Sequence, residues 1–268
     1  MNLHQTATVT LSRTLAQNLA GAGWLIAAWC LGMISVPILL WTVGDWTLPW
    51  VITVNVLVLA VANVVILVRN TTLYTALRII AVVISGAWAV EYLGSTTGFP
   101  FSHYDYTPLL QPQIAGVPAI IPLAWLMMLP ATWVIGQLLA PGRPLRQVAV
   151  AGLAMTAWDL FLDPQMVGWN FWHWAESGGY FGIPWLNFAG WFLASVVLTL
   201  AARPPVLPVR PLLVIYTLTW ALQTIGLAFF WNMPGPAFWG FLAMGLFVVV
   251  AWRRHLRGPA VISPLENA

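Results

Sequence analysis

Eight apolar stretches, each long enough to cross a lipid bilayer, constrain this chain more than any other feature of its sequence. A helix needs roughly 20 apolar residues to span the hydrocarbon core, where it satisfies its own backbone hydrogen bonds. The chain is therefore predicted to be all-α, a polytopic membrane helical bundle of about eight transmembrane helices. The predicted spans cover approximately residues 19–43, 48–68, 76–96, 117–140, 147–165, 184–202, 211–231 and 236–252.

The composition agrees with a membrane protein. Hydrophobic residues make up 60% of the 268 residues and charged residues only 6%, whereas about a quarter of the residues in an ordinary soluble domain are charged. The single Cys30 excludes an internal disulfide and a cysteine-based metal site. The first apolar run is too long for the core of a signal peptide. We therefore expect one integral membrane domain over residues 1–268, multi-pass in the cell membrane, with the lipid bilayer as its surroundings and no nucleic-acid partner.

The charged residues predict the orientation of the bundle. All ten basic residues are arginines, and cytoplasmic loops of membrane proteins are enriched in arginine and lysine. With a cytoplasmic N-terminus, the eight spans place every arginine, including Arg13, on the cytoplasmic side. Six of the seven acids then lie in the outer half, and only Glu266 does not. Both termini are therefore expected to be cytoplasmic, with the long loops at 97–116 and 166–183 external.

A weak internal repeat connects these two loops. The segments "GVPAIIPLAW" at 116–125 and "GIPWLNFAGW" at 182–191 share a Gly-Val/Ile-Pro start and a tryptophan nine positions later. Glu91 precedes the first copy by 25 residues, and Asp159 precedes the second by 23. Two helical hairpins are thus predicted to carry one acid each, roughly 7–9 Å below the outer helix ends. We expect the two carboxylates to face one shared cavity near the outer surface.

Acids at that depth are candidates for chemistry, because an ionisable group inside a bilayer is costly unless it is paired or hydrated. Neither Glu91 nor Asp159 has an arginine nearby in the sequence, which favours a functional role over a carboxylate that reaches the interface or bonds a neighbouring helix. Asp163 precedes a proline near the predicted helix end, where a solvated or structural role is an equal alternative. Asp105 and Glu176 are loop acids and are expected to be solvated.

Metal binding is one chemistry that the acids could support. Asp159 and Asp163 share a helix face in a D-x-x-x-D spacing, and membrane prenyltransferases use aspartate-rich helices to hold magnesium diphosphate. A diphosphate also requires arginine or lysine, and every arginine is predicted to lie on the opposite side. We therefore expect no metal and no cofactor.

Acid–base chemistry on an uncharged, membrane-dissolved substrate fits these residues better. A carboxyl group in an apolar pocket can remain protonated near neutral pH and act as a general acid, and aromatic faces can stabilise a carbocation. An interfacial aromatic belt is the alternative for each loop aromatic, and His103 or His173 could relay protons or only bond within the loops. The candidates for a substrate pocket are His103, Tyr104, Tyr106, Trp169, Trp172 and Trp174.

Several of these segments together resemble a known family. The chain is similar to the carotenoid biosynthesis membrane proteins that include bisanhydrobacterioruberin hydratase and the γ-carotene 1′-hydroxylase, a carotenoid 1′,2′-hydratase. The resemblance covers about residues 85–192. Its segments are "EYLGSTTGFPFSHYDYTPLL", "GVPAIIPLAW", "WDLFLDP", "FWHW" and "YFGIPWLNFAGW".

The resemblance implies that water is added across the terminal C1′,C2′ double bond of an acyclic carotenoid end group. The carotenoid would be lycopene, γ-carotene or a C50 type. Protonation at C2′ gives a tertiary cation at C1′, which water from the outer side captures without a redox cofactor. We expect Asp159 or Glu91 to be the proton donor, with the other carboxylate or Asp163 orienting the water and Asn187 bonding it.

Two other functions remain open. A membrane lycopene cyclase would share the protonation step but exclude water, so its product would be an isomer rather than a hydrate. A transporter or proton-relay protein would carry charges near the midplane, whereas these acids are predicted to lie toward one face. Retained activity in detergent without a gradient would exclude transport as the main role.

Overall fold

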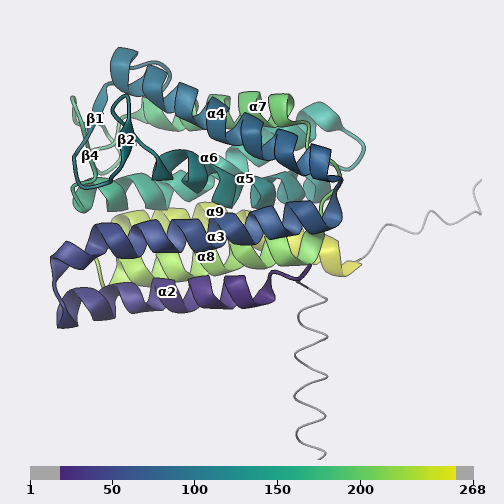
Figure 1. The fold of residues 1–268 in the computed structure, drawn as a ribbon, viewed down its shortest axis with the longest axis horizontal. Helices are drawn as coiled ribbons and strands as arrows, with labels where there is room; N and C mark the ends of the chain where they lie inside the picture. The colour runs from purple at the N-terminus through teal and green to yellow at the C-terminus, as the bar shows by residue number, and fades with distance from the viewer. Residues whose placement is uncertain (1–18, 258–268) are drawn as a thin grey trace, which may run out of the picture.

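The computed structural model describes residues 19–257, shown as a ribbon in Figure 1. Within this range eight helices are long and apolar enough to cross a membrane, which confirms the all-α, polytopic bundle. They are α2 (Gly23–Thr42), α3 (Leu48–Asn70), α4 (Leu73–Thr97), α5 (Ile120–Leu139), α6 (Pro144–Gly168), α7 (Trp185–Ala202), α8 (Val209–Phe229) and α9 (Pro234–Arg257). A short 3₁₀ helix, η1 (Asp45–Thr47), connects α2 to α3. Arg13, Glu266 and both termini lie outside the described residues.

Local sequence signals explain where several helices begin and end. Proline occupies the first turn of α3 and of α6, where its missing N–H costs no helical hydrogen bond. Thr72 accepts a hydrogen bond from the backbone N–H of Thr75 and so caps α4. Gly98, with φ of 79°, ends α4 in the left-handed conformation that glycine adopts without steric cost. The sequence predicted a span that ends at about residue 165, and α6 continues three residues further, to Gly168.

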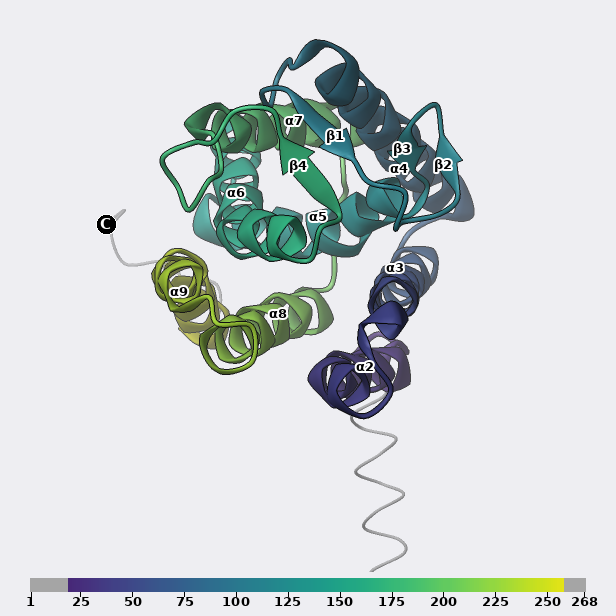
Figure 2. The ribbon, with the colours of Figure 1, turned by 90° about the vertical axis from the view of Figure 1, so that its left-hand side faces the viewer.

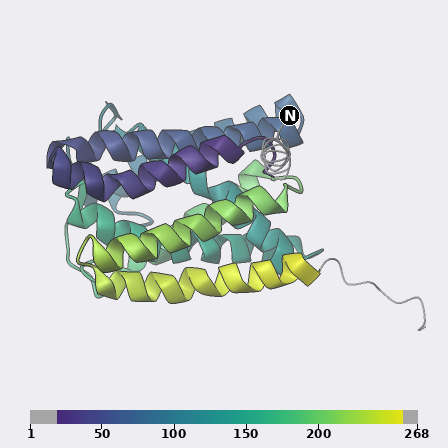
Figure 3. The ribbon, with the colours of Figure 1, turned by 90° about the horizontal axis from the view of Figure 1, so that it is seen from below.

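The helices form two groups that pack against each other (Figures 1 and 2). Helices α4, α5, α6 and α7 make one group, and the other contains the pairs α2 with α3 and α8 with α9, which Figure 3 shows from below. Helix α5 is the most buried span, with 72% of its apolar window inside the protein. It contacts helices of both groups, so it lies at the centre of the bundle.

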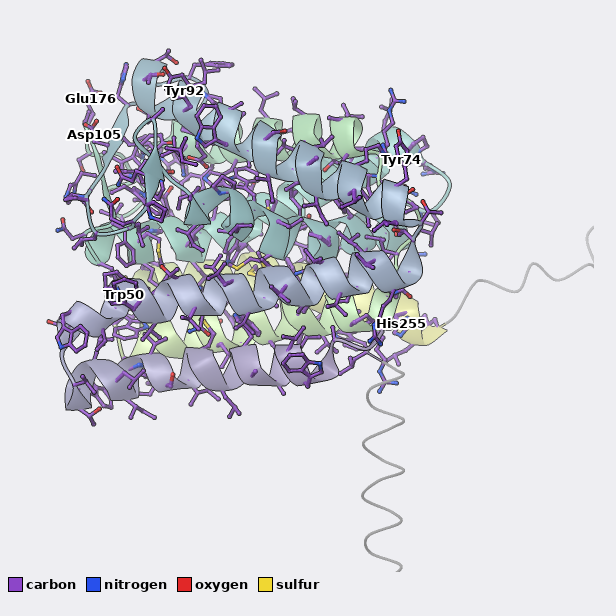
Figure 4. All side chains as sticks on the ribbon, in the orientation of Figure 1. Trp50, Tyr74, Tyr92, Asp105, Glu176 and His255 are labelled. Atoms are coloured by element: carbon purple, nitrogen blue, oxygen red, sulfur yellow. The ribbon has the colours of Figure 1, made fainter. Side chains whose placement is uncertain are left out.

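Charge separates along the bundle axis as the sequence predicted. The arginines of residues 19–257 lie near the helix ends at one end of the bundle, since Arg69 is in the last turn of α3, Arg143 precedes α6 and Arg203 follows α7. Figure 4 labels Asp105 and Glu176 at the opposite end. Which end faces the cytoplasm remains a prediction.

The two long loops join to form a cap over the arginine-free end of the α4–α7 group (Figure 2). Strand β1 (Tyr104–Tyr106) pairs antiparallel with β4 (Trp172–Trp174). Backbone bonds from Thr107 N to Phe171 O and from Ala175 N to His103 O, both 2.9 Å, extend the pairing on either side. The first loop also contains a small hairpin of β2 (Gln113–Ile114) and β3 (Val117–Pro118). The repeat-bearing loops are therefore one structural unit.

Candidate active site

A largely apolar cavity lies beneath the cap, between the two groups of helices. It encloses about 1030 Å³ of empty space, open solvent at its mouth included. Residues from α2 to α8 and from both strands β1 and β4 line it, and most of them are aromatic or aliphatic. The polar residues of the lining are Asn55, Glu91, Tyr104, Tyr106, Asp163, Gln165, Asn187, Thr219 and Gln223.

Glu91 enters the cavity from α4 with both carboxyl oxygens bonded. The hydroxyls of Tyr104 and Tyr106 donate to Oε2 at 2.5 and 2.7 Å, and the indole N–H of Trp125 donates to Oε1 at 2.8 Å. The side chain is only 5% exposed. Because every bond to these oxygens is one that they accept, the arrangement suits an ionised carboxylate.

The two tyrosines beside Glu91 are held as hydrogen-bond donors. Burial, and then the negative charge of Glu91, raises the pKa of both Tyr104 and Tyr106 well above the usual value for tyrosine. Their hydroxyls therefore keep their protons across the physiological range. The strand geometry explains their common direction, since residues 104 and 106 point to the same face of β1.

Asp159 and Asp163 form a second acidic group on α6, connected through Asn187 of α7. The side-chain amide of Asn187 donates to Oδ2 of Asp159 at 2.8 Å and also to Oδ2 of Asp163. The indole N–H of Trp172 donates to Oδ1 of Asp163 at 2.7 Å. Oδ1 of Asp159 is buried without a partner. The pair therefore has one carboxyl oxygen for which the protein supplies no donor.

The positions of the acids correct two expectations. Asp163, rather than Asp159, lines the cavity together with Glu91, and Asp159 lies behind it, fully buried. The alternative of a solvated Asp163 is also wrong, because α6 continues past this residue and leaves it 1% exposed. Asp105 and Glu176 are exposed, as expected for loop acids.

The expected pocket residues lie mostly where the sequence placed them. Tyr104, Tyr106, Trp169, Trp172, Trp174 and Asn187 all line the cavity. His103 does not: it is exposed, as is His173, because residues next to the inward-facing positions of a strand point to the opposite face. A histidine relay inside the cavity is therefore not formed by either residue.

Sequence reasoning missed three tryptophans that make the inner wall. Trp125 and Trp191 stack with ring centroids 4.3 Å apart and an interplanar angle of 9°, and Trp158 meets Trp191 edge-on at 5.9 Å. Trp125 and Trp191 are the last residues of the two repeat copies. The repeat itself was thus the available signal, because it marks the pair that meets at the cavity wall.

Comparison with known proteins gives the chain a family context. Residues 50–207 match the family described as "Carotenoid biosynthesis protein", a region wider on both sides than the segments that carried the resemblance. The chain is also 30% identical over 119 residues to a protein named bisanhydrobacterioruberin hydratase from Haloarcula japonica. That match covers 42% of this chain and 40% of the relative, so it spans less than half of either protein. No solved structure matches the chain.

Proposed function

The chain belongs to the family of carotenoid biosynthesis proteins, and from this premise we propose that it is a carotenoid hydratase, which adds water across the C1′,C2′ double bond of an acyclic end group. The observation that carries the proposal is the pairing of Glu91 with Asp163 in one apolar, tryptophan-walled cavity. An uncharged hydrocarbon fits such walls, and a carboxyl group is the strongest acid that they present. The name of the relative from Haloarcula japonica points to the same reaction class.

The arrangement of the acids supports a division of roles. Asp163 lines the cavity and shares the amide of Asn187 with Asp159, so the two adjacent carboxyls hold one proton in place of a second negative charge. Asp163, in its neutral form, gives its proton to C2′ of the end group, which leaves a tertiary cation at C1′ and a carboxylate at Asp163. Water then forms the new C–O bond at C1′, and the proton that it releases returns to Asp163, which restores the acid for the next turnover. The sum is alkene plus water giving a tertiary alcohol, so no oxidant or cofactor takes part.

Glu91 suits the role of a fixed negative charge because its oxygens already accept three hydrogen bonds from side chains. A carboxylate near C1′ lowers the energy of the cation, as preorganised charge does at other active sites. The stacked pair Trp125 and Trp191 offers aromatic faces for the same purpose. Asp159, behind Asn187, acts on the reaction through Asp163 and is a positioning residue rather than a catalytic one.

The test is expression in a host that accumulates lycopene or γ-carotene, followed by mass analysis of the pigments. A gain in mass of one water supports the hydratase. An isomer of unchanged mass would support a cyclase, and the proposal would be wrong. The same assay on purified protein in detergent, where no gradient exists, separates enzymatic hydration from transport.

We propose in addition that the cavity opens toward the outer face of the cell membrane, with the arginine-rich end in the cytoplasm. The one-sided distribution of arginines supports this orientation. Cysteine labelling at exposed loop positions tests it, with Asp105→Cys and Glu176→Cys at one end and Tyr74→Cys at the other. Labelling of the two loop positions only from the cytoplasmic side would contradict the orientation.

A further inference from the structure

The cavity contains a second polar group that the hydration mechanism does not use. It consists of three amide side chains, Asn55 from α3, Gln165 from α6 and Gln223 from α8, and we call it the amide cluster. Thr219, one turn before Gln223 on α8, also lines the cavity. All three amides are more than nine-tenths buried, with 4%, 3% and 7% of Asn55, Gln165 and Gln223 exposed.

Two oxygens of the amide cluster lack hydrogen bonds inside the protein. The amide nitrogen of Asn55 donates to the carbonyl of Val51 at 2.8 Å, which assigns the other atom as oxygen. That oxygen, and Oε1 of Gln223, are buried without a partner. An unsatisfied acceptor in an apolar interior is costly, so each of these oxygens is a place for a donor that the protein does not supply.

The cluster lies on the side of the cavity formed by α2, α3 and α8. Oδ1 of Asn55 lies close to Gly32 of α2, since a Cβ at that glycine would collide with it. Trp41 of α2 packs on Phe230 at the end of α8, with ring centroids 5.5 Å apart. Gln223 is about two helical turns before Phe230, so Asn55 and Gln223 approach the cavity from the two helices that flank α2.

Gln165 brings one amide of the cluster near the acids. It lies two residues after Asp163 on α6, and both residues line the same space. A ligand that reaches Asp163 therefore lies within about one helix diameter, 10–12 Å, of Gln165.

The chemistry of the walls defines the ligand. Apart from Glu91 and Asp163, the lining carries no charged side chain, so the cluster does not select an ion. The two atoms of the cluster that are buried without a partner are acceptors in hydrocarbon surroundings. We propose that the amide cluster is a binding subsite for a hydroxyl group, which donates a hydrogen bond to the unpartnered oxygen of Gln223 or of Asn55. The hydroxyl belongs to the carotenoid or to a water molecule that the cluster stores beside the reacting end group; that carotenoids enter this cavity rests on the proposed function.

Equilibrium binding, which needs no turnover, tests whether the hydroxyl belongs to the carotenoid. Purified protein in detergent is titrated with lycopene, a pure hydrocarbon, and with an acyclic carotenoid of equal length that carries one hydroxyl, using quenching of tryptophan fluorescence. We expect the wild type to bind the hydroxylated carotenoid about 5-fold more tightly, the effect of one hydrogen bond. Gln223→Met and Asn55→Leu keep the size of the side chain, and the variant that removes the accepting oxygen should abolish this preference. A preference that survives in both variants overturns the carotenoid as the source of the hydroxyl.

Asn63→Leu is the matched control. Asn63 lies on α3 two turns after Asn55, is fully buried and also has an unpartnered Oδ1, but it does not line the cavity, and its amide bonds the carbonyls of Leu59 and Met127. This variant should keep the preference for the hydroxylated carotenoid. Equal thermal unfolding of the cavity variants and the wild type shows that they fold.

The rate of hydration at saturating lycopene tests the second source of the hydroxyl, a water molecule stored by the amide cluster. If the cluster stores water, the wild type shows no preference between the two carotenoids, and Gln223→Met and Asn55→Leu slow hydration about 5-fold while Asn63→Leu does not. The proposal is overturned if the wild type shows no preference and both cavity variants hydrate at the wild-type rate. If the protein hydrates no carotenoid, the proposed function fails, and the binding comparison alone decides the subsite.

Discussion

The hairpin of α4 and α5 and the hairpin of α6 and α7 each bring acid to the cavity, and each supplies the donors for its own acid. Glu91 of the first hairpin is bonded by Tyr104, Tyr106 and Trp125, which all lie between its two helices or within them. The acids of the second hairpin are bonded by Trp172 and Asn187, again from the same hairpin. The weak repeat in the sequence therefore corresponds to a repeated site.

The two hairpins differ in how many donors each carboxyl receives. Three side chains serve the single carboxyl of Glu91, whereas two side chains serve the two carboxyls of Asp159 and Asp163 and leave Oδ1 of Asp159 without a partner. The two aspartates accept from the same amide of Asn187 and have one oxygen free, so they can hold one proton between them, since two adjacent negative charges in an apolar interior are costly. The comparison teaches that one hairpin is built to hold a negative charge and the other to hold a proton.

Asp163→Asn should have the largest effect. The variant keeps the size of the side chain but removes the acid that faces the substrate, so hydration should fall toward the upper end of the 10²–10⁴-fold range of general acid catalysis. Pigment analysis at matched protein levels measures the loss. Asp105→Asn, on the exposed face of β1, is the control and should hydrate normally. A wild-type rate for Asp163→Asn would mean that Asp163 does not supply the proton, which contradicts the role proposed for the second hairpin.

Glu91→Gln should reduce hydration by about 10²-fold, the effect of losing one preorganised electrostatic contact. Carotenoid binding should change little, because the ground-state substrate is uncharged. The kcat and KM of purified protein separate the two effects. An effect confined to KM would mean that Glu91 shapes the cavity and does not stabilise the cation.

Asp159→Asn should cost about 10-fold, the size of one hydrogen bond to a charged group, because Asp159 reaches the substrate only through Asn187 and Asp163. The ratio of this loss to that of Asp163→Asn shows how the second hairpin divides the holding of the proton between its two aspartates. Equal losses in the two variants would instead mean that the aspartates act as a unit in which either can hold the proton.

The smallest effect concerns the stability of the first hairpin at high pH. The pKa values of Tyr104 and Tyr106 are raised in the folded state. The stability that this shift contributes is therefore complete below the pKa of about 10 that tyrosine has in the unfolded chain, and it is lost as the pH rises toward the folded pKa values. Above that pH the unfolded chain releases protons that the folded protein keeps, and stability falls by up to about 1.4 kcal/mol per pH unit for each tyrosine.

Thermal unfolding in detergent between about pH 9 and 11 measures this decline. This range covers about one pH unit on either side of the usual tyrosine pKa. The double variant Tyr104→Phe/Tyr106→Phe should show a smaller decline. It retains Tyr180, whose pKa is also raised by burial, the buried Tyr216 and the exposed Tyr74 and Tyr92. The same decline in the double variant would mean that other groups cause it.

The sequence predicted the spans because long apolar runs have few alternatives in a membrane. It could not choose between Asp159 and Asp163, since residues four apart on a helix differ in direction by only about 40°. Which of the two faces the cavity depends on the rotation of α6 against its neighbours. The continuation of α6 through Pro164 was a further obstacle, because a proline more often marks a helix end.

Pairing over long sequence distances accounts for the other misses. Whether His103 points inward depends on the register of β1 against β4, and a shift of one residue reverses every side chain of a strand. The amide cluster shows no motif, because Asn55 and Gln223 lie in separate spans and line one cavity only through the arrangement of α2, α3 and α8. The stacked pair of Trp125 and Trp191 could have been predicted, since the repeat had already aligned these two residues.

The pairing of β1 with β4 joins the two loops into one cap, and residues of this cap donate hydrogen bonds to acids of both hairpins. Tyr104 and Trp172 belong to the paired strands, and they are also the residues that bond Glu91 and Asp163. Parting the strands to admit bulk water would withdraw donors from both carboxyls at once. Both carboxyls therefore keep their full set of donors only while the two strands stay paired, so the stability of this short pairing and the integrity of the site depend on the same contacts.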